Sequence, residues 1–298
     1  MVSSAFHPDL RRAARFIPRG GIGPRTLPVL QALVGLQGRR RPRGVEVLDL
    51  PSGANVRVFR PQNPPAHPAP ALLWIHGGGY VMGSAAQDDR LCRRFSDELG
   101  ATVASVDYRL APRNPYPAAL DDCWAALTEL AGLPGVDPAR VAIGGASAGG
   151  GLAAALAQLA ADRDGVKPVL QLLVYPMLDD RSAALPANPG YRLWNPRSNL
   201  FGWTSYLGNA DPQVAVPARR ADLSGLAPAW IGVGALDLFY DEDLAYAERL
   251  QQAGVPCEVE TVPGAFHGFD LLMPKAPVSQ TFFAGQCASL RNAFTRKG

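Results

Sequence analysis

The chain has 298 residues, of which 47% are hydrophobic and 18% are charged, with a formal net charge of +3. A chain of this length buries most of the surface that its unfolded form exposes. The composition agrees with such a core. A core of this size needs no disulfide or structural metal to hold the fold together.

The cysteines and the apolar runs bear on the compartment. The four cysteines are far apart and show no C-x-x-C pairing, so we expect buried thiols in a reducing compartment and no zinc. No apolar run reaches the length of a membrane span, about 20 residues, and the N-terminus lacks the pattern of a signal peptide. We therefore expect no metal, no membrane span and a cytoplasmic location. The cysteines are Cys92, Cys123, Cys257 and Cys287.

The N-terminal segment is strongly basic. The first 45 residues contain nine arginines and one acid, Asp9. Such a segment could contact nucleic acid or anionic lipid. No recognition motif or set of interleaved aromatic residues accompanies it, so we favour the solvated face of a helical extension and expect no nucleic-acid partner. The arginines are Arg11, Arg12, Arg15, Arg19, Arg25, Arg39, Arg40, Arg41 and Arg43.

Short β-type runs follow, and most of them are continuous apolar segments. Such runs are typical of strands that are buried on both faces of a sheet. The first two runs are joined by the turn Pro51-Ser52-Gly53 without a helix, which predicts an antiparallel hairpin at the sheet edge. The runs are Val45–Leu50, Val56–Arg60, Ala71–Ile75, Thr102–Asp107, Arg140–Ile143, Val169–Tyr175, Ala229–Gly234 and Glu258–Val262.

Helical patterns alternate with strands from the third run onward. This alternation predicts a mostly parallel sheet with helices on both faces. Residues 1–44 and about 178–226 do not fit the alternation, and insertions of this length are usually lids or binding elements. We assign both to a cap and residues 45–298 to one domain. The helical patterns are Asp88–Leu99, Ala118–Ala131, Ala148–Arg163, Asp241–Ala253 and Ser279–Phe294.

The motif G-x-S-x-G spans residues 145–149, directly between a β-type run and an Ala/Leu-rich helical pattern. In this context the motif predicts a sharp strand-to-helix turn that exposes the hydroxyl of Ser147 as a nucleophile. The helix that begins at Ala148 would aim unsatisfied N–H groups at the same point. The alternative is that these small residues only begin a helix and mark no nucleophile, but the second motif favours the nucleophile.

That second motif is His76-Gly77-Gly78-Gly79, a loop after an apolar run. Successive glycines let backbone N–H groups turn toward a ligand, so Gly78 and Gly79, with Ala148, are candidates for an oxyanion hole. A phosphate loop is the alternative, but neither G-x-G-x-x-G nor G-K-S/T occurs here. The pairing of H-G-G-G with G-x-S-x-G is an established pattern of lipases and esterases.

The acid and the base follow from chain order. In hydrolases with a G-x-S-x-G turn between a strand and a helix, the catalytic residues come in the order Ser, then Asp or Glu, then His. Of four histidines only His267 follows Ser147. Asp237 ends an apolar run and stands at the carboxyl edge of a core strand, where it would hold the His267 tautomer. We interpret His76, which precedes the serine, as loop-orienting. Residues 241–243 are three acids that we interpret as charges favouring a helix N-terminus.

With these motifs in place, the chain resembles the bacterial members of the hormone-sensitive lipase family of esterases over residues 45–290. The resemblance implies an α/β-hydrolase fold with an eight-stranded sheet, a helical cap, no cofactor and hydrolysis of short or medium acyl esters. Homodimers are common in such families. Ala146 and Arg113 depart from the family pattern. Further similar runs are Asp107-Tyr108-Arg109-Leu110-Ala111-Pro112, Tyr116-Pro117-Ala118-Ala119-Leu120-Asp121-Asp122, Tyr175-Pro176, Asp237 to Glu242 and His267-Gly268-Phe269.

The motifs leave two other functions open. An amidase or a deacylase of a specialised metabolite would use the same residues on a different small-molecule acyl substrate. A small-molecule receptor on a hydrolase scaffold is a function of another class, but it would be expected to lack a member of the triad. Here Ser147, Asp237 and His267 are all present.

Overall fold

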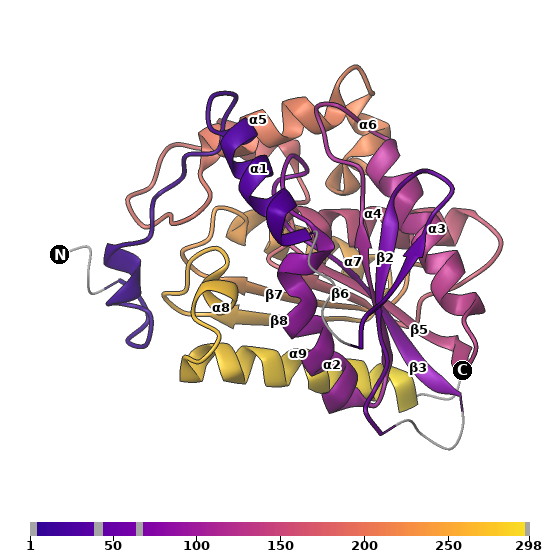
Figure 1. The fold of residues 1–298 in the computed structure, drawn as a ribbon. Coiled ribbons are helices and arrows are strands. Elements are labelled where there is room, and N and C mark those ends of the chain that lie inside the picture. The colour runs from indigo at the N-terminus through magenta and orange to yellow at the C-terminus, as the bar shows by residue number, and fades with distance from the viewer. Residues whose placement is uncertain (1–4, 39–43, 64–67, 296–298) are drawn as a thin grey trace.

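The computed structural model describes residues 5–38, 44–63 and 68–295. Its centre is an eight-stranded sheet in the order β1-β2-β4-β3-β5-β6-β7-β8 (Figure 1). The β1–β2 and β2–β4 pairs are antiparallel and the remaining pairs are parallel, so the predicted edge hairpin and mostly parallel sheet are confirmed. The strands are β1 (Glu46–Asp49), β2 (Asn55–Phe59), β3 (Ala69–Ile75), β4 (Thr102–Asp107), β5 (Val136–Ala146), β6 (Gln171–Val174), β7 (Ala229–Gly234) and β8 (Cys257–Val262).

The helices occupy the expected places, with bounds that differ from the prediction by at most two residues in the domain core. The α-helices are α1 (Leu27–Gly38), α2 (Asp89–Leu99), α3 (Ala118–Gly132), α4 (Ala148–Asp162), α5 (Pro196–Leu207), α6 (Pro212–Ala215), α7 (Tyr240–Gln252), α8 (Phe269–Leu272) and α9 (Pro277–Thr295). Short 3-10 helices are η2 (Ala13–Arg15), η3 (Ala85–Asp88), η4 (Asp180–Ala184) and η5 (Pro217–Arg219).

Strand β3 shows why both faces of the sheet need helices. Successive side chains of a strand point to opposite faces. Leu73 and Ile75 accordingly pack into the core with α3, α4 and α7, whereas Leu72 and Trp74 pack into a second core with α2 and α9. Burying each such leucine stabilises the fold by about 2 kcal/mol. A polar residue at the same position, on either face, would lose this stabilisation.

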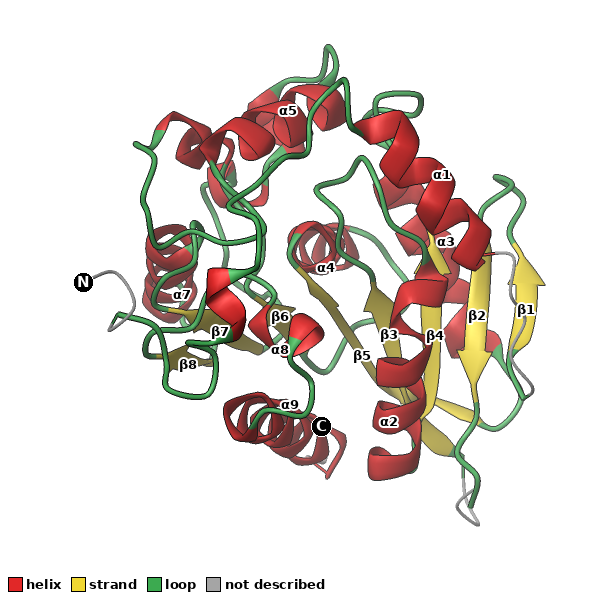
Figure 2. Ribbon diagram, turned by 60° about the vertical axis from the view of Figure 1, so that its left-hand side comes forward, coloured by secondary structure: helices red, strands yellow, loops and turns green. Residues whose placement is uncertain are grey.

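The two segments outside the alternation lie near the carboxyl ends of the parallel strands. Residues 178–226 contain η4, α5, α6 and η5. In both views α1 lies next to α5, on the side of the molecule opposite α9 (Figures 1 and 2). The first described residues lie elsewhere, because the His7 N–H donates to the Gly264 carbonyl at 2.9 Å and the Phe6 ring contacts the Phe266 ring. The N-terminal segment is therefore two separate packing elements rather than one helical extension.

The basic N-terminal residues and the cysteines mostly match their expected environments. Arg12, Arg15, Arg19 and Arg25 are exposed, whereas Arg11 is half-buried. The other four arginines of the cluster lie outside the described residues. Cys92, Cys123 and Cys287 are buried free thiols, but Cys257 is half-buried. In the described ranges, no helix is both long and apolar enough to cross a membrane.

Candidate active site

Ser147 lies on the sharp turn between β5 and α4. Its backbone has φ of 57° and ψ of −121°, a strained conformation for a residue with a side chain. The neighbouring glycines permit the turn, because a Cβ on Gly145 would lie 2.6 Å from the Ile75 carbonyl oxygen and one on Gly149 only 2.0 Å from it. The glycine spacing of the motif therefore reflects the close packing of β3 against β5 and α4.

The structure brings Ser147, His267 and Asp237 together from three separate loops. His267 Nε2 lies 2.9 Å from Ser147 Oγ, and His267 Nδ1 lies 2.8 Å from Asp237 Oδ2. A carboxylate only accepts hydrogen bonds, so we assign the proton of the neutral imidazole to Nδ1, which leaves Nε2 as an acceptor for the serine hydroxyl. This arrangement can remove a proton from Ser147.

The surroundings of the triad hold its geometry. All three side chains are buried, with exposed fractions of 7% for Ser147 and 4% for both Asp237 and His267. Asp237 Oδ1 accepts the Phe239 N–H at 3.0 Å, so both carboxyl oxygens have partners. The rings of Tyr175 and Phe239 pack edge-on against the imidazole. Exclusion of water from such a site strengthens the electrostatic interactions among these groups.

Backbone N–H groups beside Ser147 are free to receive negative charge. Gly78 and Gly79 have positive φ angles of 131° and 61°, and both line the same cavity as Ser147. The N–H groups of Gly78, Gly79 and Ala148 donate to no atom in the part of the chain that the structure describes. Ala148 is also the first residue of α4, where the helix dipole favours an anion.

His76 lies beneath the glycine loop and does not reach the serine. It is fully buried, its Nδ1 lies 2.8 Å from the Gly77 carbonyl oxygen, and its ring stacks on Tyr108. Burial lowers the pKa of His76, against the opposing effect of Asp107. A neutral His76 whose Nδ1–H donates to Gly77 would hold the loop backbone, and its orienting role stays a prediction from the sequence.

A cavity of about 730 Å³ opens beside Ser147. Its walls include Ile22, which precedes α1, and Leu193 and Trp194, which precede α5. Sequence reasoning missed Trp194, as well as Asp88 and Asp270 in the same walls, because no motif marks them. Within the described residues, no cluster of His, Cys, Asp or Glu could hold a metal ion.

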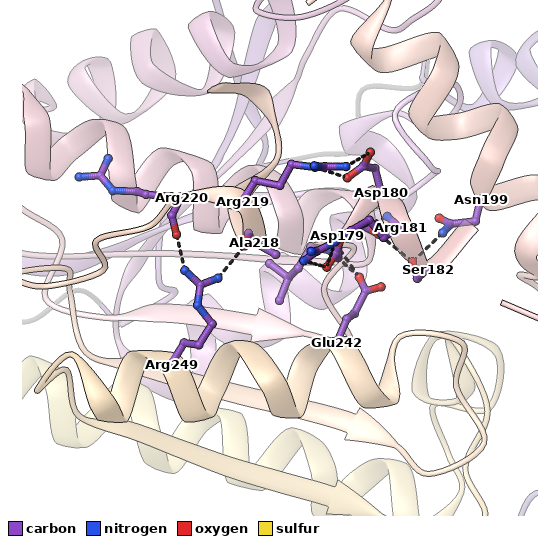
Figure 3. Close-up of polar contacts among 11 residues, drawn as sticks. Asp179, Asp180, Arg181, Ser182, Asn199, Ala218, Arg219, Arg220, Glu242 and Arg249 are labelled. Carbon is purple, nitrogen blue, oxygen red and sulfur yellow. Dashed lines mark hydrogen bonds and ion pairs between the residues drawn. The ribbon is translucent and has the colours of Figure 1, made fainter. Parts of the chain in front are cut away.

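The acids at the start of α7 differ from their sequence interpretation. Asp241 is exposed in the first turn, as a helix-terminal charge would be. Glu242 instead turns inward, and its Oε1 accepts the N–H groups of Leu178 at 2.7 Å and Asp179 at 3.1 Å (Figure 3). Burial raises the pKa of Glu242 to about 8 and raises the pKa of the fully buried Asp243 well above its usual range. Both carboxyls are therefore buried groups, which three consecutive acids in the sequence do not indicate.

Comparison with known proteins identifies the family. A family model described as an alpha/beta hydrolase fold matches residues 72–271. The esterase LipI of Mycobacterium tuberculosis is 36% identical over 269 residues, covering 87% of this chain and 80% of that protein. This chain belongs to the hormone-sensitive-lipase-like α/β-hydrolase esterases. The family expected from the motifs is thereby confirmed.

Other relatives of this esterase agree on the class of reaction. The ethyl acetate hydrolase of Pseudomonas putida is 38% identical over 228 residues, covering 72% of this chain and 70% of that protein. The solved structure of a bacterial heroin esterase superposes with a TM-score of 0.88 at 35% identity, covering 99% of this esterase and 100% of that chain. The esterase is a carboxylic ester hydrolase of the expected fold.

Proposed function

We propose that the esterase hydrolyses small carboxylic esters through an acyl-enzyme, with Ser147 as nucleophile, His267 as base and Asp237 as the orienting acid. The observation that carries the proposal is the continuous chain of hydrogen bonds from the Ser147 hydroxyl through His267 to Asp237, at 2.9 Å and 2.8 Å. Nucleophile, base and orienting acid within hydrogen-bond reach are the signature of nucleophilic acyl transfer.

Acylation begins when Ser147 Oγ attacks the ester carbonyl carbon and its proton passes to His267 Nε2. The carbonyl oxygen becomes an oxyanion, which accepts the N–H groups of Gly78, Gly79 and Ala148. Each such donor is worth roughly 10²–10³ in kcat in related machinery. The imidazolium, stabilised by Asp237, then gives its proton to the leaving alcohol as the acyl-enzyme forms.

Deacylation repeats the chemistry with water. His267 takes a proton from water, the resulting hydroxide attacks the acyl carbon, and the carboxylic acid leaves as Ser147 regains its proton. No metal or organic cofactor enters either step.

The cap, as we propose it, comprises the N-terminal segment and residues 178–226. Ile22 from the first, and Leu193 and Trp194 from the second, line the cavity with Ser147. The cavity volume fits a short or medium acyl ester. The name of the ethyl acetate hydrolase relative supports a short acyl group. A cytoplasmic location and a homodimer stay predictions from the sequence.

The proposal is tested by Ser147→Ala. We expect the variant to lose turnover of phenyl acetate and labelling by a fluorophosphonate probe, while its circular dichroism and melting temperature match the wild type. Activity equal to the wild type would refute the assignment of the nucleophile.

The two alternatives have different outcomes. An amidase or metabolite deacylase would lose the same activity in Ser147→Ala but would hydrolyse aryl amides or acetylated metabolites with higher kcat/KM than esters in a substrate panel. A receptor on this scaffold would bind ligand without fluorophosphonate labelling of the wild type. No observation in the structure favours either one over the esterase.

A further inference from the structure

The cavity that contains Ser147 extends beyond the triad toward η3, α8 and α9. Asp88 from η3, Asp270 from α8 and Ser279 from α9 line this part of it. Figure 2 shows α2, α8 and α9 gathered on the side of the molecule opposite α5, so segments far apart in the sequence build this part. We call Asp88 and Asp270 the acidic end of the cavity.

Both carboxyls of the acidic end receive hydrogen bonds from neutral donors. Trp74 Nε1–H donates to Asp88 Oδ2 at 2.9 Å, and the Tyr175 hydroxyl donates to Asp270 Oδ1 at 2.7 Å. Asp88 is 5% exposed. Neither carboxyl forms an ion pair with a lysine or arginine in the part of the chain that the structure covers. Their charge therefore has no fixed cation.

Burial disfavours the charged form of both groups. Burial raises the pKa of Asp88 to about 7, and the nearby Asp270 raises it as well. Burial also raises the pKa of Asp270, which protonated His267 would lower. A buried carboxylate without a neighbouring cation is unfavourable, and a cation entering the cavity would favour its charged form.

Ser279 supplies an independent sign of a ligand. Its side chain is 2% exposed, it lines the same part of the cavity, and its Oγ has no hydrogen-bond partner among the described residues. A buried hydroxyl is normally hydrogen-bonded, and an unpaired one is costly. Its lone pairs can accept a hydrogen bond from a ligand N–H. This feature fits the same ligand chemistry as the two carboxyls.

Cations at the outer part of the cavity do not neutralise the acidic end. Arg90 and Lys275 are exposed, so water and salt screen their charges. Arg94 donates to Gln280 Oε1 at 2.6 Å and lies over the Phe283 ring. Asp88 is buried and Asp270 is half-buried, so their attraction for a cation inside the cavity is less screened than the repulsion from these exposed residues.

We propose that the acidic end, Asp88 with Asp270, binds a protonated amine carried by the substrate, so that the esterase prefers amine-bearing esters over neutral esters of the same shape. This inference rests on the proposed function, because it names the substrate class of the same cavity. The ammonium N–H groups would donate to Asp88, Asp270 and Ser279 while the ester carbonyl lies at Ser147.

The test compares two esters of nearly equal shape, 2-(dimethylamino)ethyl butyrate and 3-methylbutyl butyrate, at pH 7.5. They differ by a protonated nitrogen in place of a CH group. We expect wild-type kcat/KM to be at least about tenfold higher for the amine ester, because its ammonium adds one charge-assisted hydrogen bond. Equal values, or a preference for the neutral ester, would overturn the proposal.

Variants test whether Asp88 and Asp270 produce the preference for the amine ester. Asp88→Asn should reduce the ratio of the two kcat/KM values by at least about tenfold. Asp97→Asn removes an exposed carboxylate from α2 and should keep the wild-type ratio. If Asp88→Asn does not fold, Asp270→Asn is compared by the same ratio, which cancels any effect on His267 common to both esters. A ratio that survives in every folded variant of the acidic end would contradict the assignment.

Failure of this inference differs from failure of the proposed function. A wild type that hydrolyses phenyl acetate through Ser147 but shows no amine preference would reject only the inference. A wild type without activity on phenyl acetate or either butyrate would reject the proposed function itself. The wild-type ratio is decisive even if no variant folds.

Discussion

Replacing Glu242 with alanine should destabilise the esterase through two hydrogen bonds that join α7 to the start of the 178–226 insertion. Glu242 Oε1 accepts the N–H groups of Leu178 and Asp179 (Figure 3). Leu178 is fully buried, so its N–H would be left without a partner. A buried donor left unpaired costs about 1–3 kcal/mol, and we expect a loss of this size from Leu178, with less from Asp179 because it is half-buried. That is a large part of the 5–15 kcal/mol that typically stabilises a native protein, so the effect is measurable.

Glu242→Gln separates the hydrogen bonds from the charge. The amide oxygen can accept the same two N–H groups, so we expect a loss of only about 1 kcal/mol or less at pH 5. The pKa of Glu242 is raised from 4.5 to about 8 in the folded state. A raised pKa means that the unfolded state loses its proton first, so this group's contribution to stability falls as pH rises between about 4.5 and 8. Glu242→Gln should therefore become more stable relative to the wild type over that window.

Urea denaturation at pH 5 and pH 8 measures both effects. Glu248→Ala removes an exposed glutamate from the same helix and should change the free energy of unfolding by no more than about 0.5 kcal/mol. If Glu242→Ala has the same free energy of unfolding as Glu248→Ala, the reasoning from the hydrogen bonds is refuted. If the difference in free energy of unfolding between Glu242→Gln and the wild type is the same at pH 5 and at pH 8, the reasoning from the pKa is refuted.

Two further substitutions probe the site. Asp237→Asn should lower kcat on phenyl acetate by roughly 10⁴-fold with little change in fold, because an amide does not hold the His267 tautomer; a loss below tenfold would contradict that role. Gly79→Ala places a Cβ 2.1 Å from Trp194 Cη2 at a positive φ, so the loop must shift and kcat should fall by roughly 10²-fold. Gly132→Ala, where a Cβ meets nothing within 4 Å, should retain wild-type kcat in the same assay.

The sequence was sufficient for much of this protein because the relevant signals are local. Apolar runs of strand length predicted most strands of the sheet, since a strand covered on both faces needs apolar side chains at successive positions. The glycines around Ser147 marked the turn, because any Cβ there would collide with the Ile75 carbonyl. Chain order then singled out His267, the one histidine after the serine.

The environments of the acidic side chains depend instead on contacts between segments that are distant in the sequence. Three consecutive acids at residues 241–243 look alike in the sequence, yet Asp241 is exposed while Glu242 bonds to backbone 64 residues away. Asp88 and Asp270 likewise become cavity walls only when η3 and α8 lie at the same edge of the sheet. The environment of a charged side chain depends on which other segments exclude water from it, and one stretch of sequence does not contain that information.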